Sequence, residues 1–184
     1  MQTIHPVKVD NISVATKRLL DAANEERGVQ ASNMIKTLAQ SPRALEGYLE
    51  FRDALSGGTL SPAISEQIAL VVAQTNLCEY SLAEHAHLGA KLGLKKQQIL
   101  ESREARATDQ KTEAVLRFAR DLTARRGGCS MDELRENGYS DAEIIEVVAH
   151  VALNIFENCL NEVAGTVLDF PKVEFRESTL TAAI

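Results

Sequence analysis

The stretch from Glu66 to Leu94, EQIALVVAQTNLCEYSLAEHAHLGAKLGL, decides both the fold and the chemistry that this sequence suggests. It opens with an apolar run and continues with a pattern typical of a second helix. In that second helix Cys78, Ser81 and His85 lie at positions i, i+3 and i+7, so a thiol, a hydroxyl and an imidazole share one helix face. No other stretch of the chain combines groups of this kind.

Helix start and stop signals recur along the chain. Ser41-Pro42 and Ser61-Pro62 each predict a helix start, and Gly93 predicts a helix stop. We expect capping boxes at Asn76 to Glu79, Ser130 to Glu133 and Ser140 to Glu143. Since no stretch has a clear strand pattern, the sequence predicts an all-α, oligomeric helical protein.

The two ends of the chain give weaker signals. A first helix is expected from Val9 to Arg27 with Asp10 or Asn11 as its N-cap, and the longest apolar helix should run to about Gly165. The tail from Asp169 onward is expected to cover a neighbouring subunit or to fray. With 184 residues and no linker, we expect one domain spanning residues 1–184.

Composition excludes several classes of protein. The net charge is −6 with basic and acidic residues interleaved, which argues against nucleic acid as a partner. No apolar run is long enough to cross a membrane, and the first residues do not have the form of a secretory signal. Three cysteines without framework spacing also fit a cytoplasmic protein.

Cys78 is the candidate nucleophile. A thiol in the first turn of a helix lies near the positive end of the helix dipole, which favours the thiolate and lowers the pKa. His85 lies two turns further on, and Glu66 can orient its imidazole if the two helices form a hairpin. The alternative is purely structural: a buried cysteine, a hydrogen-bonded core histidine and a surface carboxylate. Spacing alone slightly favours this alternative.

We expect neither a metal nor a cofactor. His85 and His87 are two residues apart and point to nearly opposite sides of a helix, and Cys78 with His85 would supply only two ligands. A Ser81–His85–Glu66 relay for hydrolysis is also disfavoured, because no oxyanion hole is recognisable.

Other polar groups have open roles. Cys129 and Cys159 are expected to be unpaired thiols, and either could resolve an oxidised Cys78 if the fold brings them together. A polar stripe on the last long helix either lines the cavity beneath Cys78 or fastens a subunit interface. The interface is the preferred interpretation, because asparagine is a poor acid–base catalyst. The stripe comprises His150, Asn154, Asn158 and Asn161.

The chain resembles the alkylhydroperoxidase D-like (AhpD-like) core of the carboxymuconolactone decarboxylase superfamily. Redox members carry a Glu followed, about a dozen residues on, by Cys-x-x-Cys-x-x-x-His. Glu66 precedes Cys78 by that interval, and CEYSLAEH matches the motif at every position but one. The flanks SPRALEGYLEFRDALSGG and DAEIIEVVAHVALNIFENCLNEVAG with LDFP are similar too, so the resemblance covers about residues 35–171.

The one departure from the motif is Ser81. In redox members the cysteine at this position attacks the peroxide and the first cysteine resolves it, but a serine can form neither a sulfenic acid nor a disulfide. Three interpretations stay open. Cys78 works as a lone thiol with an external thiol as resolver, Ser81 is an introduced Cys-to-Ser change, or the redox role is lost in favour of acid–base chemistry.

The resemblance therefore implies an antioxidant, thiol-dependent peroxidase that assembles as a trimer or hexamer. In this hypothesis Cys78 is the thiol, His85 the base and Glu66 the relay partner, with Ser81 in the attacking-cysteine position. The expected partners are a peroxide or other small molecule and an external thiol reductant. The alternatives are a decarboxylase-like lyase acting on a small carboxylic acid, and a non-catalytic oligomeric binding protein.

Overall fold

The computed structural model describes residues 2–27, 31–124 and 131–175. Within these ranges the chain forms helices joined by turns and contains no strand, which confirms the all-α prediction. The helices are η1 (Val9–Asn11), α1 (Val14–Arg27), α2 (Asn33–Leu38), α3 (Pro42–Ser56), α4 (Pro62–Thr75), α5 (Glu79–Lys91), α6 (Lys96–Arg103), α7 (Gln110–Thr123), α8 (Met131–Glu136) and α9 (Asp141–Ala164).

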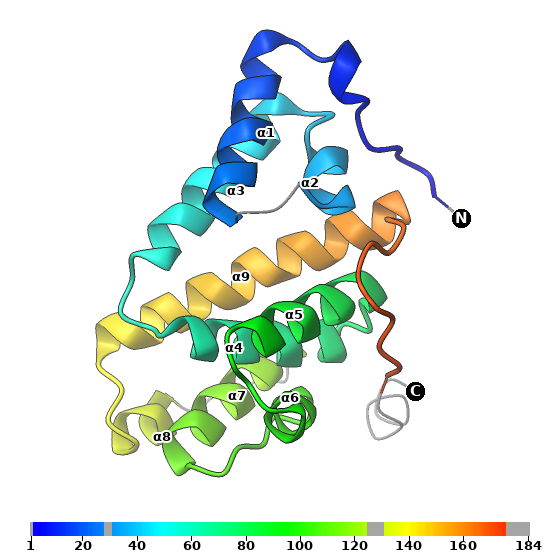
Figure 1. The fold of residues 1–184 in the computed structure, drawn as a ribbon. Helices are drawn as coiled ribbons and strands as arrows, with labels where there is room; N and C mark the ends of the chain where they lie inside the picture. The colour runs from blue at the N-terminus through cyan, green and yellow to red at the C-terminus, as the bar shows by residue number, and fades with distance from the viewer. Residues whose placement is uncertain (1, 28–30, 125–130, 176–184) are drawn as a thin grey trace.

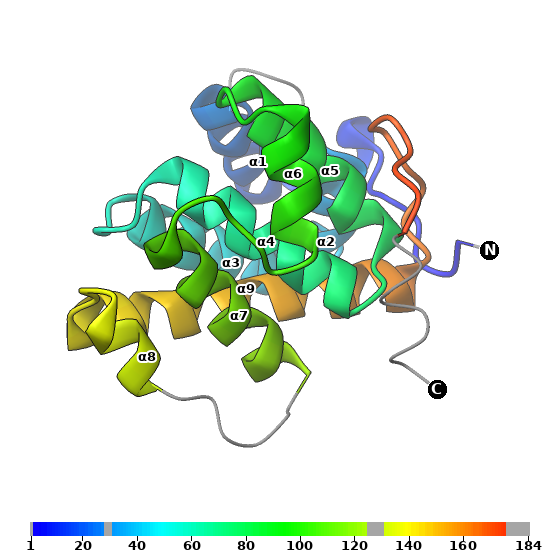
Figure 2. The same cartoon turned by 90° about the horizontal axis from the view of Figure 1, so that it is seen from below.

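Helix α9 crosses the middle of the molecule, with α1, α2 and α3 on one side and α4 to α8 on the other (Figure 1). Helix α4 contacts α5, α6, α7 and α9, so it is surrounded by neighbours along most of its length. Seen from below, α6 and α7 lie in front of α4 (Figure 2). None of the helices in the described ranges is long and apolar enough to span a membrane.

Two large apolar clusters pack on the two sides of α9. One lies between α4, α7, α8 and α9 and includes Ile68, Val115 and Leu134. The other joins α1, α2 and α3 and includes Met34 and Leu45. Burying a side chain of this size contributes roughly 1.5–3 kcal/mol relative to its exposed state, so these clusters hold the helices in place. The polar groups of the site lie where α3, α4, α5 and α9 meet.

Several predicted helix boundaries are confirmed. Ser41 and Ser61 are the N-caps of α3 and α4, and each side chain accepts a hydrogen bond from the backbone three residues on. Ser140 and Glu143 form the capping box that opens α9. Gly93, with φ +91°, follows the end of α5 as predicted. Ser130, the expected cap of α8, lies outside the described residues.

The predicted start of the first helix is wrong. Helix α1 begins at Val14, and the hydroxyl oxygen of Ser13 accepts from the N–H of Thr16, so neither Asp10 nor Asn11 is its cap. Both of those residues belong to the separate turn η1.

The tail, as far as residue 175, packs on its own chain. Asp169 accepts a 2.6 Å hydrogen bond from the hydroxyl of Tyr80 and a 2.7 Å bond from the backbone N–H of Asn33. Phe170 meets the ring of Tyr80 edge-on at 5.8 Å. These contacts contradict the expectation that this part of the tail frays, and the covering of a neighbouring subunit stays a prediction.

The capping box of α9 gives the first testable prediction. Replacing Ser140 with Ala removes the acceptor for the Glu143 N–H and should lower the free energy of unfolding by about 0.5–2 kcal/mol, measured by urea denaturation. Ser140→Asp keeps an acceptor oxygen and should retain most of the native stability. Equal losses in the two variants would contradict a capping role for Ser140.

Candidate functional site

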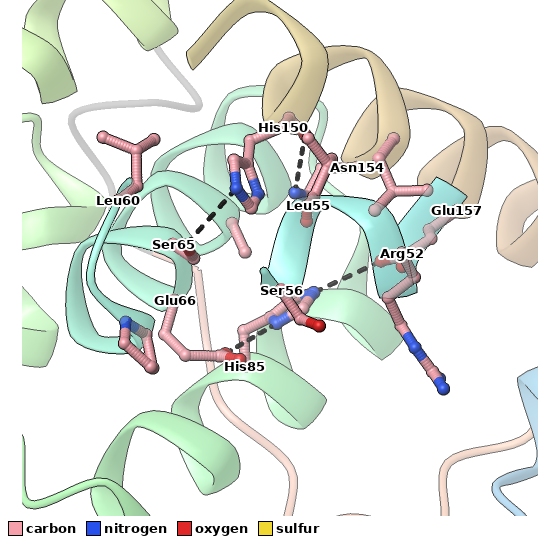
Figure 3. A pocket seen from close by; sticks show the side chains of 13 residues that line it. Arg52, Leu55, Ser56, Leu60, Ser65, Glu66, His85, His150, Asn154 and Glu157 are labelled. Carbon is pink, nitrogen blue, oxygen red and sulfur yellow. Dashed lines mark hydrogen bonds and ion pairs between the residues drawn. The ribbon is translucent and has the colours of Figure 1, made fainter. Parts of the chain in front are cut away.

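His85 is held between two carboxylates. It lies buried on α5, and its Nδ1 is 2.9 Å from Oε2 of Glu66 on α4. Its Nε2 is 3.3 Å from Oε2 of Glu157 on α9. Figure 3 shows the imidazole with these two contacts at one end of a pocket. The predicted pairing of Glu66 with His85 is therefore present, and a third group joins it.

This geometry keeps the imidazole protonated. An ionised carboxylate can only accept a hydrogen bond, so each ring nitrogen must carry a proton to bond both neighbours. Burial acts to lower the pKa of His85, but the charges and hydrogen bonds of Glu66 and Glu157 together outweigh it and raise the pKa well above its ordinary value. His85 is thus a proton donor in this state.

Glu157 and Tyr48 are the site residues that the sequence analysis missed. The hydroxyl of Tyr48, on α3, donates a 2.6 Å hydrogen bond to Oε1 of Glu157. Tyr48 fits the apolar periodicity of its helix, and its ring is indeed buried. Glu157 had a detectable signal, because it lies seven residues after His150 and four before Asn161, within the polar stripe.

A helix-ending turn places Cys78. The N–H groups of Leu77 and Cys78 donate to the carbonyls of Gln74 and Ala73, at 3.3 and 3.0 Å, which is the Schellman pattern. Leu77 has φ +55°, a conformation that usually requires glycine. Asn76 therefore ends α4 instead of opening α5, so the capping box predicted there is wrong. Cys78 is the N-cap of α5.

The thiol of Cys78 belongs to a small polar chain. Cys78 Sγ donates to Ser81 Oγ at 3.2 Å, and Asn161 Nδ2 donates to the same oxygen at 3.2 Å. Burial raises the pKa of Cys78, and the opposing effects of the Ser81 hydrogen bond and the His85 charge do not compensate. The lowered pKa expected from the helix dipole is therefore wrong.

Cys78 and His85 face different cavities. Glu66, His85 and Glu157 line a cavity of about 190 Å³, and Cys78 is not part of its wall. Cys78 and Asn161 line a second cavity of about 210 Å³, which His85 does not reach. The predicted contact between Cys78 and Ser81 is present, but the thiol and the imidazole open to separate spaces.

The polar stripe of α9 is buried inside its own chain. His150, Asn154, Asn158 and Asn161 are each at most 7% exposed. His150 and Asn154 line the cavity beside His85, and Asn161 lines the cavity beside Cys78. The preferred interpretation of the stripe as a subunit interface is therefore wrong. Its residues line two cavities, whereas one cavity was expected.

The remaining cysteines stay apart from this network as far as the structure describes it. Cys78 is a buried free thiol and Cys159 an exposed one. Cys129 lies outside the described residues, so its role as a resolver stays a prediction. In the described part of the chain, no group of three or more His, Cys, Asp or Glu residues could hold a metal ion.

The doubly paired imidazole predicts how stability depends on pH. Because the pKa of His85 is raised above the value of about 6.5 in an unfolded chain, its stabilising charge is fully present below about pH 6.5. That contribution is lost as the pH rises through the folded pKa. We expect the free energy of unfolding, measured in urea, to fall from pH 6.5 into the alkaline range. His85→Gln should be less stable at pH 6 and lose less on alkalinisation.

Replacement of the exposed His5 by Gln is the matched control and should leave the native pH profile unchanged. The pKa of His150 is lowered by burial, so its titration affects stability only below this range. A native profile that stays flat or rises above pH 6.5 would contradict the protonated imidazole.

Solved structures share this arrangement of helices. A peroxidase-related protein from Ralstonia eutropha JMP134, with an AhpD core, is 19% identical, with a TM-score of 0.77 over 92% of this chain and 94% of its own. A peroxidase-related protein from Silicibacter sp. TM1040 is 20% identical, with a TM-score of 0.78 over 90% and 92%. A variant of the debrominase Bmp8 in complex with 2,3,4-tribromopyrrole is 15% identical, with a TM-score of 0.78 over 100% and 97%.

The sequence comparison agrees with this likeness. No curated protein matches the sequence. The model of the carboxymuconolactone decarboxylase family matches residues 42–125, which include Glu66, Cys78, Ser81 and His85. The family match, the shared fold and the Glu66 to His85 spacing agree with one another. Residues 42–125 of the chain thus match the carboxymuconolactone decarboxylase family, and the chain has the helical fold of AhpD-like proteins.

Proposed function

We propose that this protein is a thiol-dependent oxidoreductase that reduces peroxides with electrons from an external thiol. The observation that carries the proposal is the hydrogen bond from Cys78 Sγ to Ser81 Oγ, on the helix that also holds His85. The family match over residues 42–125 and the likeness to two peroxidase-related proteins support the same class of chemistry. We place the reaction in the cytoplasm, where small thiols are kept reduced.

The reaction would use Cys78 as its only redox group. Its sulfur attacks one peroxide oxygen, so an S–O bond forms and the O–O bond breaks. Cys78 is oxidised to a sulfenic acid, and the peroxide is reduced to an alcohol or water. One external thiol then forms a mixed disulfide with Cys78 and releases water. A second external thiol displaces Cys78 and leaves as the oxidised disulfide.

The proton movements follow from the hydrogen bonds. Ser81 accepts a hydrogen bond from the thiol of Cys78, and the thiol proton passes to solvent when the thiolate forms. His85 lies one helical turn beyond Ser81. His85, protonated between Glu66 and Glu157, opens to a different cavity from Cys78, so we assign it an electrostatic role in which its charge stabilises the Cys78 thiolate. This revises its expected role as a base. Glu66 keeps the imidazole charged, and the leaving oxygen takes its proton from solvent.

Peroxide treatment should oxidise Cys78. We expect dimedone to trap a sulfenic acid on the peptide that contains Cys78, as detected by mass spectrometry. Labelling should be faster at alkaline than at neutral pH, because the raised pKa of Cys78 leaves little thiolate at pH 7.

Cys78→Ala should lose thiol-dependent peroxide consumption, whereas the matched variant Cys159→Ala, at an exposed thiol, should keep it. A Cys78 that forms neither a sulfenic acid nor a mixed disulfide would refute the proposal.

Ser81→Cys separates the two redox interpretations. A gain in peroxide consumption would indicate a dithiol cycle interrupted at this position. An unchanged rate, with Cys78 still labelled, would indicate that Cys78 works as a lone thiol.

One observation favours a second candidate, a lyase that works by acid–base catalysis. The cavity lined by Glu66, His85 and Glu157 excludes Cys78, so its chemistry requires no thiol. The structural neighbour Bmp8 was solved with an organic ring compound, 2,3,4-tribromopyrrole. A carboxymuconolactone decarboxylase-like activity of this kind would survive in Cys78→Ala, which distinguishes it from the peroxidase.

We also infer that α9 joins copies of the chain into a homo-oligomer, for which the superfamily suggests a trimer or hexamer. Its outer face carries exposed apolar side chains at helical spacing, and Ile145 and Val163 are 68% and 67% exposed. Exposed apolar side chains grouped on one helix face are typical of association sites. The exposed residues are Ile145, Val148, Phe156 and Val163.

Light scattering after size exclusion tests this inference. The native protein should have three or six times the chain mass of 20.1 kDa. The double variant Ile145→Glu/Val163→Glu should shift toward 20.1 kDa. Val14→Glu changes an equally exposed apolar residue on α1 and should leave the mass unchanged. A native chain that runs as a monomer at micromolar concentration would refute the α9 interface.

A further inference from the structure

The cavity beside His85 has polar groups at two ends and apolar walls between them. Glu66 and His85 lie at one end, and His150 and Asn154 lie apart from them on the α9 side (Figure 3). His85 is hydrogen-bonded to Glu66 and Glu157. At the other end, one buried oxygen of Asn154 has no donor among the described residues.

Asn154 supplies a hydrogen-bond acceptor that has no donor. Its Nδ2 donates a 2.8 Å bond to the carbonyl of His150, which fixes the orientation of the amide. Its Oδ1 is buried and bonds to no donor among the described residues. The whole side chain is only 5% exposed and forms part of the cavity wall. A buried acceptor left in this state costs about 1–3 kcal/mol, which a ligand N–H or O–H would recover.

The groups beside Asn154 are uncharged. The hydroxyl of Ser65 donates to the carbonyl of Ser61, so its oxygen is free to accept from Nε2 of His150, 3.4 Å away. Burial lowers the pKa of His150, which keeps this imidazole neutral. This end therefore suits a neutral polar group.

The size and charge of the cavity limit its ligand further. Leu55, Leu60 and Leu153 form apolar wall between the two polar ends. The volume of about 190 Å³ compares with roughly 150 Å³ for an apolar protein cavity that binds benzene. Two carboxylates, the imidazolium of His85 and the guanidinium of Arg52 line the cavity, so its formal charges cancel and no net positive charge attracts an anion.

We propose that this cavity binds an uncharged organic molecule about the size of one ring, whose N–H or O–H donates to Oδ1 of Asn154. The ring packs against the leucines, and its opposite edge faces Glu66 and His85. The cavity shares Glu66 and His85 with the proposed peroxidase, but Cys78 does not line it, so ring binding goes beyond that function and needs no thiol.

Phenol, anisole and benzoate are the probes, because they share one ring and differ in the substituent that reaches Asn154. At pH 7 phenol is neutral with a donor, anisole is neutral without one, and benzoate is an anion. Calorimetric titration should give phenol an affinity at least about tenfold above that of anisole, the factor expected for one buried hydrogen bond. Benzoate should not bind at the concentrations that saturate with phenol.

Asn154→Leu replaces the amide by an apolar group of similar size and should bind phenol and anisole equally. Asn158→Leu is the matched control, since Asn158 is an equally buried amide on α9 outside the cavity wall, and the preference for phenol should persist. Should either variant fail to fold, the side-chain amide resonance of Asn154 in the native protein replaces it, and phenol but not benzoate should shift that resonance.

Equal affinities for phenol and anisole in the native protein, no binding of either, or an undiminished preference in Asn154→Leu would overturn the proposal. Because these experiments measure binding alone, they can be repeated in Cys78→Ala with the same expected result. Loss of peroxidase activity and loss of ring binding are therefore distinguishable.

Discussion

The site depends on one buried ion cluster, the imidazole of His85 between the carboxylates of Glu66 and Glu157. The three residues come from α5, α4 and α9, so the cluster links the hairpin of α4 and α5 to the central helix. Removing one partner of a buried ion pair commonly costs about 3–5 kcal/mol, because a charge is left in a medium that solvates it poorly. The position of α9 against the hairpin is consequently tied to the protonation state of one side chain.

The same packing separates the thiol from the imidazole. Leu77 takes a left-handed backbone conformation, which for a residue with a Cβ costs roughly 1–2 kcal/mol. The turn that results allows Cys78 to cap α5 while lying among buried side chains of α1, α2 and α3. Cys78 is close enough to His85 to be influenced by its charge, yet each group opens to its own cavity. Ser81 is the hydrogen-bond partner of the thiol, and Asn161 donates to the same Ser81 oxygen.

Local sequence signals predicted the helices well, because a serine cap or a glycine stop acts within a few residues. The same signals predicted the pairing of Glu66 with His85, since the two helices are consecutive and form a hairpin. They could not identify the contacts of Glu157 and Tyr48, whose partners lie 72 and 109 residues away in sequence. The error at Asn76 has a related cause. Asn76 fits two local patterns, the end of one helix and the start of the next, and in the structure it ends α4.

Ser81 has a structural role that the comparison with the redox motif does not reveal. Its side chain is fully buried and accepts hydrogen bonds from both Cys78 and Asn161. Sulfur is a weak acceptor, so a cysteine at this position would add a second thiol but leave the Asn161 amide poorly satisfied. The hydroxyl is therefore integrated into the packing between α5 and α9. Through the bond from Asn161, position 81 links the two helices that carry the site.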